Sequence, residues 1–70
     1  MHPITATMAG SVWRILVNRG DEIKEDQDLA ILESMKMEIP IEARASGKIN
    51  EVKVSEGDFV NEGDVLFILD

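Results

Sequence analysis

The chain contains an internal repeat, and this repeat limits the possible folds more than any other feature of the sequence. When the sequence is shifted against itself by 37 residues, positions 6–33 align with positions 43–70, and nine of the 28 pairs are identical. Two units are too few for a solenoid, so we expect a pseudo-twofold pair of units that close on each other around a shared core. The identical pairs are Ala6/Ala43, Gly10/Gly47, Val17/Val54, Gly20/Gly57, Asp21/Asp58, Glu25/Glu62, Leu29/Leu66, Ile31/Ile68 and Leu32/Leu69.

Both units carry the signals of β-strands. Residues 11–17 and 48–54 are rich in β-branched side chains, and each segment runs into a turn, residues 18–21 and 55–58, whose third residue is a glycine that can supply a positive φ. The apolar positions of both segments step by three residues and then by two, which predicts a repeated β-bulge or a change of facing sheet. These positions are Val12, Ile15 and Val17, with their counterparts Ile49, Val52 and Val54.

The remaining apolar segments also favour short strands. Residues 29–32 and 65–69 are nearly continuous apolar runs, as expected of strands that cross a barrel-like core. Pro40 interrupts the alternating stretch 37–42, which predicts a strand at the edge of a sheet or one that pairs through its other residues. The sequence therefore predicts an all-β fold of about eight short strands.

The size and charge of the chain narrow its possible functions. Seventy residues make a single domain, residues 1–70, that buries only about 60% of the surface its unfolded form exposes. The absence of cysteine excludes disulfides and thiolate chemistry. A net charge of −7 argues against nucleic acid and membrane partners, because it repels phosphates and anionic headgroups. No apolar run is long enough to cross a bilayer, so we expect a soluble, cytoplasmic protein.

Residues 34–42 belong to neither aligned copy and join the first unit to the second. Symmetry places them on or near the twofold axis, and strand-like residues on both sides leave room only for a hairpin turn with Lys36 at its tip. This turn contains no Gly, Asn or Pro, although two-residue hairpin loops favour residues that tolerate positive φ. Departures of this kind from local turn chemistry tend to mark functional sites.

The segment Glu33-Ser34-Met35-Lys36-Met37 resembles the Met-Lys-Met biotinylation motif of biotinyl domains. Residues 47–49, 54–60 and 63–66 resemble the second half of the biotinyl/lipoyl fold, so the resemblance covers nearly the whole chain, and it is greatest to small free-standing bacterial attachment proteins. It implies a barrel-sandwich hybrid, a flattened barrel of two four-stranded antiparallel sheets related by a pseudo-twofold axis. In this family the modified lysine lies on the exposed turn between the halves.

The resemblance also implies a function, that of a biotin carboxyl carrier. A biotin protein ligase would attach biotin to Lys36 through a stable amide, and the biotin would carry CO2 between a biotin carboxylase and a carboxyltransferase. Met35, Met37, Glu33 and Ser34 would be recognition residues for the ligase. The domain would be the substrate of the ligase and a monomer when isolated, with no catalytic residue of its own.

Four other interpretations compete with this one. Lipoylation of Lys36 is the main alternative, although lipoyl domains typically carry Asp-Lys-Ala where this chain has Met-Lys-Met. A structural interaction module comes next, and an enzyme comes after it, because the only histidine, His2, lies at the terminus and cannot build a hydrolase triad. Lys36 could also be an ordinary surface lysine beside two methionines that fill gaps in the core.

Two further groups of residues invite a functional interpretation. The acidic residues of the first unit look like a metal cluster, but their counterparts in the second unit include the apolar Val65, so we expect a solvated loop and no metal site. Trp13 occupies a strand position, where we expect it to be partly buried, with the border of a partner surface as the alternative. The acidic residues are Asp21, Glu22, Glu25, Asp26 and Asp28.

Overall fold

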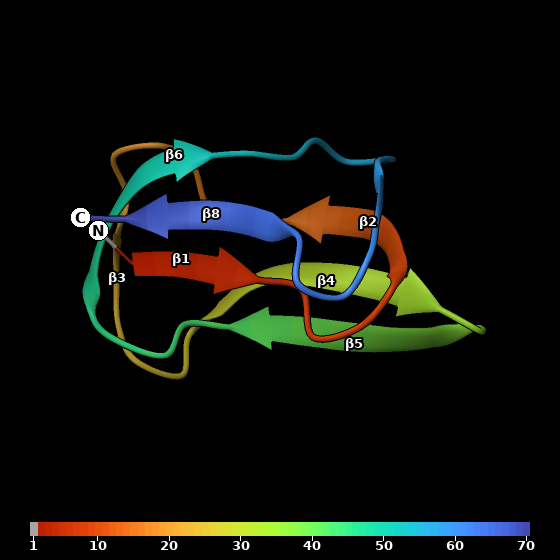
Figure 1. The fold of residues 1–70 in the computed structure, drawn as a ribbon. Helices are drawn as coiled ribbons and strands as arrows, with labels where there is room; N and C mark the ends of the chain where they lie inside the picture. The colour runs from red at the N-terminus through yellow and green to blue at the C-terminus, as the bar shows by residue number, and fades with distance from the viewer. Residues whose placement is uncertain (1) are drawn as a thin grey trace.

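The computed structural model describes residues 2–70, which form two four-stranded sheets (Figure 1). The strands are β1 (His2–Thr5), β2 (Gly10–Ile15), β3 (Glu22–Ile23), β4 (Asp28–Ser34), β5 (Met37–Glu42), β6 (Gly47–Val52), β7 (Phe59–Val60) and β8 (Val65–Leu69). All pairings are antiparallel, in the order β1-β8-β6-β3 in one sheet and β5-β4-β2-β7 in the other. The predicted all-β fold is confirmed. Over the same residues, no helix is long and apolar enough to span a membrane.

The pseudo-twofold relation between the halves is also confirmed. A shift of 37 residues carries β1 to β4 onto β5 to β8, and it converts the strand order of the first sheet into that of the second. The hydrogen bonds between the halves follow the same relation, since Gly20 N–H donates to the carbonyl of Ile49 at 2.8 Å and Gly57 N–H donates to that of Val12 at 2.7 Å. Each half is therefore fastened to a strand of the other half.

The structure corrects the predicted limits of the repeat. Residues 34–42 were assigned to neither copy, but β5 is the counterpart of β1, and Pro3/Pro40 and Ile4/Ile41 are further identical pairs at the same shift. These pairs are hard to see in the sequence because they stand apart from the long aligned stretch. Positions 1–33 thus correspond to positions 38–70, and only residues 34–37 have no counterpart.

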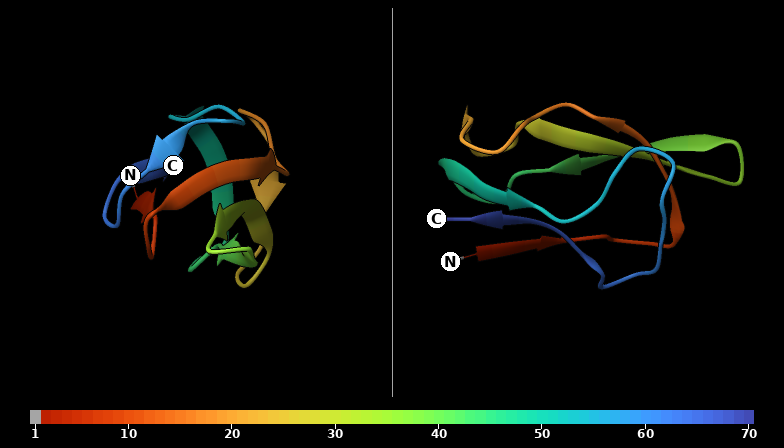
Figure 2. Two further views of the ribbon diagram at one scale, coloured as in Figure 1. Left: turned by 90° about the vertical axis from the view of Figure 1, so that its right-hand side faces the viewer. Right: turned by 90° about the horizontal axis from the view of Figure 1, so that it is seen from above.

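The core lies between the two sheets, whose backbones Figure 2 shows from the end and from above, because the buried side chains of both sheets form a single cluster. Among residues 2–70 every buried side chain is apolar, so the side chains between the sheets contribute apolar packing and no buried polar contact. The predicted bulge is confirmed in both halves, because the register shifts between Val12 and Arg14 in β2 and between Ile49 and Glu51 in β6. Pro40 lies in β5 at the edge of its sheet, as expected. The fully buried side chains of largest volume are Phe67, Leu29, Leu32, Ile41, Ile49, Leu66, Leu69 and Val12.

Candidate functional site

The hairpin of β4 and β5 presents Lys36 at one end of the molecule. Glu33 pairs with Glu38 and Ser34 pairs with Met37, so that Met35 and Lys36 alone form the loop. Figure 1 shows this loop at the end of the domain opposite to the two termini, and Figure 2 shows it extending beyond the neighbouring strands. The longest dimension of the domain is 31 Å, against 19 and 18 Å for the others. Lys36 therefore lies at the tip of an elongated domain.

The backbone of this loop is in the left-handed region at both central residues. Met35 has φ 51° and Lys36 has φ 64°, which is the pattern of a type I′ turn. Outside this turn, Asp26 is the only non-glycine residue with positive φ in the part of the chain that the structure describes. A non-glycine residue in this region costs about 1 to 2 kcal/mol, so the paired strands hold the loop against its local preference. Stored strain of this kind concentrates at binding and catalytic sites.

The side chains of the loop are open to solvent. Met35 is 91% exposed and Met37 is 65% exposed, and Lys36 is exposed as well. Within residues 2–70 the only ion pair joins Lys53 to Glu51 at 3.1 Å, so no carboxylate holds the Lys36 ammonium in place. The Lys36 side chain is therefore exposed and without an ion-pair partner among the described residues, and an exposed methionine stands on each side of it in the sequence.

At the base of the hairpin, two glutamates face each other across the strands, and the backbone of β2 lies close to that of β4. Glu33 and Glu38 are both exposed and lie directly opposite each other, an arrangement that repulsion disfavours. Ser34 is half-buried. A Cβ added at Gly10 would lie 2.8 Å from the carbonyl oxygen of Glu33, whereas at the symmetry-related Gly47 the nearest atom would be 3.8 Å away. The backbone of β2 therefore lies close to that of β4 at Gly10, beside the hairpin, and β6 has no equally close contact at Gly47. Because both positions are glycine, the sequence does not reveal this difference.

The site residues expected from the sequence thus fall into two groups. Glu33, Ser34, Met35, Lys36 and Met37 lie together on one hairpin. The acidic residues from Asp21 to Asp28 are exposed, and within residues 2–70 no three His, Asp or Glu side chains gather closely enough to hold a metal ion. Trp13 is 42% exposed and counts among the exposed large apolar side chains, so it is more open to solvent than the partly buried position expected from the sequence.

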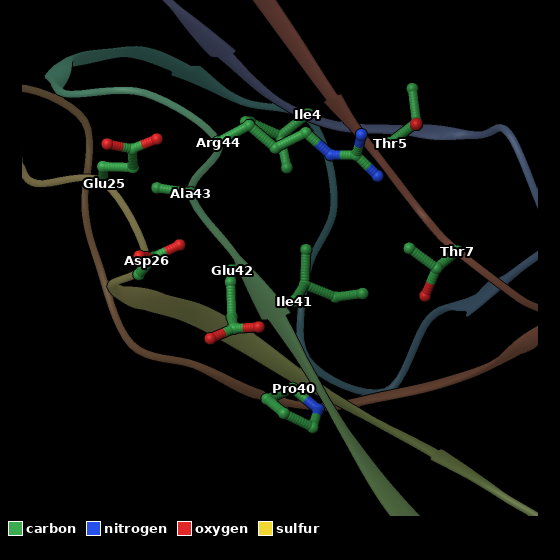
Figure 3. A pocket seen from close by; sticks show the side chains of 10 residues that line it. All are labelled: Ile4, Thr5, Thr7, Glu25, Asp26, Pro40, Ile41, Glu42, Ala43 and Arg44. Carbon is green, nitrogen blue, oxygen red and sulfur yellow. The ribbon is translucent and has the colours of Figure 1, made fainter.

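A depression of about 330 Å³ lies between β1 and β5, the edge strands of the two sheets (Figure 3). Its walls include Arg44 together with the carboxylates of Glu25, Asp26 and Glu42. It is lined by the end of β5 that is remote from the loop, and Lys36 is not part of its wall. The depression and the Lys36 loop are therefore separate features of the surface.

Comparison with known proteins finds relatives that align with nearly the whole chain. The Biotin_lipoyl family model, described as "Biotin-requiring enzyme", matches residues 2–69. The chain is 59% identical over 66 residues to the biotin/lipoyl attachment protein of Bacillus subtilis, covering 94% of this chain and 90% of that protein. It is 45% identical over 64 residues to the biotin carboxyl carrier protein of Streptococcus mutans, covering 91% of this chain and 49% of that protein.

Solved structures with the same fold are parts of much larger proteins. The urea carboxylase of Kluyveromyces lactis superposes with a TM-score of 0.92 at 26% identity over 99% of this chain, which is 6% of that protein. A single-chain, multi-domain long-chain acyl-CoA carboxylase superposes with a TM-score of 0.89 at 29% identity over 94% of this chain, which is 7% of that protein. The chain thus matches a small segment of each.

Proposed function

Because the chain belongs to the biotin/lipoyl attachment family, we propose that it is a biotin carboxyl carrier and that Lys36 is its biotin acceptor. The observation that carries this proposal is the solvent-exposed Lys36 at the tip of a two-residue loop, with no carboxylate bound to its ammonium group among the described residues. An exposed primary amine is the group needed to form a stable amide with the biotin carboxylate.

The proposed attachment needs a ligase that has already activated biotin as biotinyl-AMP. The Lys36 nitrogen attacks the acyl carbon, a C–N bond forms, and the bond to the phosphate oxygen breaks so that AMP leaves with the electron pair. A base of the ligase takes the amine proton. Met35 and Met37 offer apolar contacts on both sides of the entering lysine, since they are 91% and 65% exposed.

In its carrier role, bound biotin supplies the ureido nitrogen that holds CO2 during transfer. The protein contributes presentation, because Lys36 lies at one end of the long axis and both termini lie at the other (Figure 1). A chain that is tethered through its termini would therefore direct Lys36 away from the tether and toward the carboxylase and carboxyltransferase sites. Tethering would also raise the effective concentration of the carrier at those sites.

Lipoylation of Lys36 is the second candidate. The attachment protein of Bacillus subtilis, at 59% identity, is named for both groups, and an exposed lysine on a type I′ loop could accept either. We favour biotin, because two apolar side chains flank Lys36 where lipoyl domains typically carry Asp and Ala.

Both candidates can be tested by incubating the purified chain with a biotin ligase and, separately, with a lipoate ligase. We expect a mass increase of one biotinyl group and peptide mapping to Lys36. Lys36→Arg should abolish it, whereas Lys24→Arg, Lys48→Arg and Lys53→Arg should leave it complete. Biotin on another lysine with Lys36 unmodified would refute the site, and modification by the lipoate ligase alone would refute the choice of cofactor.

A further inference from the structure

The outer faces of the two sheets are related by the pseudo-twofold axis but differ in character. Three large apolar side chains are exposed on or next to the sheet that carries the hairpin, and polar side chains occupy the equivalent positions of the other sheet. The pairs are Trp13 and Asn50, Leu16 and Lys53, and Phe59 and Glu22, with exposed fractions of 42%, 49% and 66% for the three apolar members.

The fold itself does not require these apolar residues. Asn50 occupies the same bulge position in β6 that Trp13 occupies in β2, and both bulges form. On the second sheet the neighbouring side chains form the Lys53–Glu51 ion pair at 3.1 Å, whereas on the first the Arg14 guanidinium lies 5.0 Å from the centre of the Trp13 ring. Aromatic side chains are enriched at protein–protein interfaces relative to the rest of the surface, so their exposure on this sheet favours a binding surface.

Phe59 lies close to the hairpin along the sheet, and Trp13 follows two residues after Ser11 in β2, next to Val12, which pairs with Leu32. Phe59 pairs with Ser11, and Ser11 pairs with Glu33, so Phe59 lies level with the base of the hairpin and two strands away from it. From strand geometry, this places Phe59 about 14 Å from the Lys36 backbone. An ordinary protein interface covers about 800 Å² on each partner, or a patch with a radius of about 16 Å. An enzyme that encloses Lys36 would therefore reach this aromatic face.

We propose that Trp13 and Phe59 form, together with Glu33 and Glu38, a docking surface for the ligase that modifies Lys36. This inference rests on the proposed function. The ligase would present an apolar recess to the two aromatic rings. It would place basic side chains against the two glutamates, which repel each other across the hairpin when no partner is present. The net charge of −7 favours the same type of partner, since a basic patch on the ligase would be attracted from a distance.

The test replaces each aromatic residue with the residue that the other sheet carries at the same position. In the double variant Trp13→Asn with Phe59→Glu, we expect the ligase KM for the protein to rise about tenfold, with kcat within about twofold of the parent. The matched control is Leu16→Lys, which removes an exposed apolar side chain next to the same sheet but beyond the end of β2, away from the hairpin. Its KM should stay within about twofold of the parent.

A second measurement needs no substitution. Trp13 is the only tryptophan of the chain, so its indole N–H gives a single resonance in ¹⁵N-labelled protein. This resonance should shift when unlabelled ligase is added. An unchanged KM for the double variant, or an indole signal that ligase does not move, would overturn the docking surface. Peptide mapping separates this failure from failure of the proposed function, because the function fails only if the parent protein is not biotinylated at Lys36.

Discussion

Two kinds of turn in this domain meet the same backbone requirement in opposite ways. In the turns at residues 18–21 and 55–58, glycines take the positive φ, with values of 92° at Gly20 and 96° at Gly57. In each turn an aspartate side chain also accepts a hydrogen bond at 2.8 Å from the backbone N–H three residues before it. The loop at Met35 and Lys36 has positive φ at both residues but no glycine to take it.

The difference follows from what each turn is attached to. The two glycine turns donate hydrogen bonds to strands of the opposite half, so they fasten the halves together and carry residues that lower the cost of the turn. The Lys36 loop is joined directly to β4 and β5 alone, and β2 supports only the base of the hairpin, where Ser11 pairs with Glu33. Within residues 2–70 its two residues make no hydrogen bond that fastens the halves, so they can be selected for recognition by a partner. The pairing of β4 with β5 compensates for the cost of their positive φ.

The largest effect that this comparison predicts concerns the position of the lysine within the loop. The double variant Met35→Lys with Lys36→Met keeps composition, charge and hydrophobicity unchanged. Side chains at adjacent positions of a hairpin project in different directions, so the moved lysine should miss the ligase site. We expect the rate of biotinylation to fall by about 100-fold or more, which corresponds to about 2.7 kcal/mol in the transition state.

The parent protein and a melting curve are the controls for this exchange. Substitutions at an exposed turn usually change stability by no more than about 0.5 kcal/mol, so the melting temperature should be nearly unchanged. Efficient biotinylation of the moved lysine would show that the ligase responds to an exposed lysine beside methionine, and not to the geometry of this loop.

Substitution of the glycines in the two glycine turns should lower the stability of the domain. Gly20→Val and Gly57→Val each place a β-branched residue at positive φ, which we expect to lower the free energy of unfolding by about 1 to 2 kcal/mol. For a domain of this size, 1 kcal/mol shifts the melting temperature by about 4 to 8 °C. Because no atom lies within 4 Å of a Cβ at either position, the effect would come from the backbone and not from a clash.

Gly47→Ala is the matched control for these variants, since Gly47 has no positive φ and its nearest atom would be 3.8 Å from the new Cβ. Its melting temperature should fall by much less. If Gly20→Val and Gly57→Val melt like the parent, the two turns do not fasten the halves in the way the hydrogen bonds suggest.

Much of this architecture could be predicted from the sequence, because the repeat records each element twice. The paired bulges and the positive φ of Gly20 and Gly57 were predicted, since each appears at equivalent positions in both halves. The position of Lys36 at the tip of a hairpin followed from its place between the two copies. Residues that are identical in the two copies indicate what both halves need in order to fold.

Features that differ between the halves could not be predicted in this way. Gly10 and Gly47 are identical in sequence, yet only Gly10 lies against the backbone of Glu33, because only the first half carries the hairpin beside it. The exposure of Phe59 depends on its place in β7, a two-residue strand whose neighbour is fixed by long-range pairing with β2. These asymmetric features are visible only once the sheets are assembled, and they lie near the proposed site.

The variant with the smallest predicted effect tests whether the residues of the Lys36 loop lower the stability of the domain while they favour recognition by the ligase. Met35→Asn places at φ 51° a residue that tolerates the left-handed region, and it removes a side chain that is already 91% exposed. We expect the free energy of unfolding to rise by about 0.5 kcal/mol and the melting temperature by about 2 to 4 °C. Biotinylation should become slower, because the apolar contact next to Lys36 is lost.

Met37→Asn is the matched control, because it removes the same type of exposed side chain from the other side of Lys36, where φ is not positive. It should slow biotinylation without raising the melting temperature. The comparison between the two kinds of turn predicts that stability and modification move in opposite directions only at Met35. If Met35→Asn leaves the melting temperature unchanged or lowers it, the loop is not strained by its residues, and its lack of glycine would need another cause. If it is biotinylated as fast as the parent, Met35 is not part of the surface that the ligase recognises.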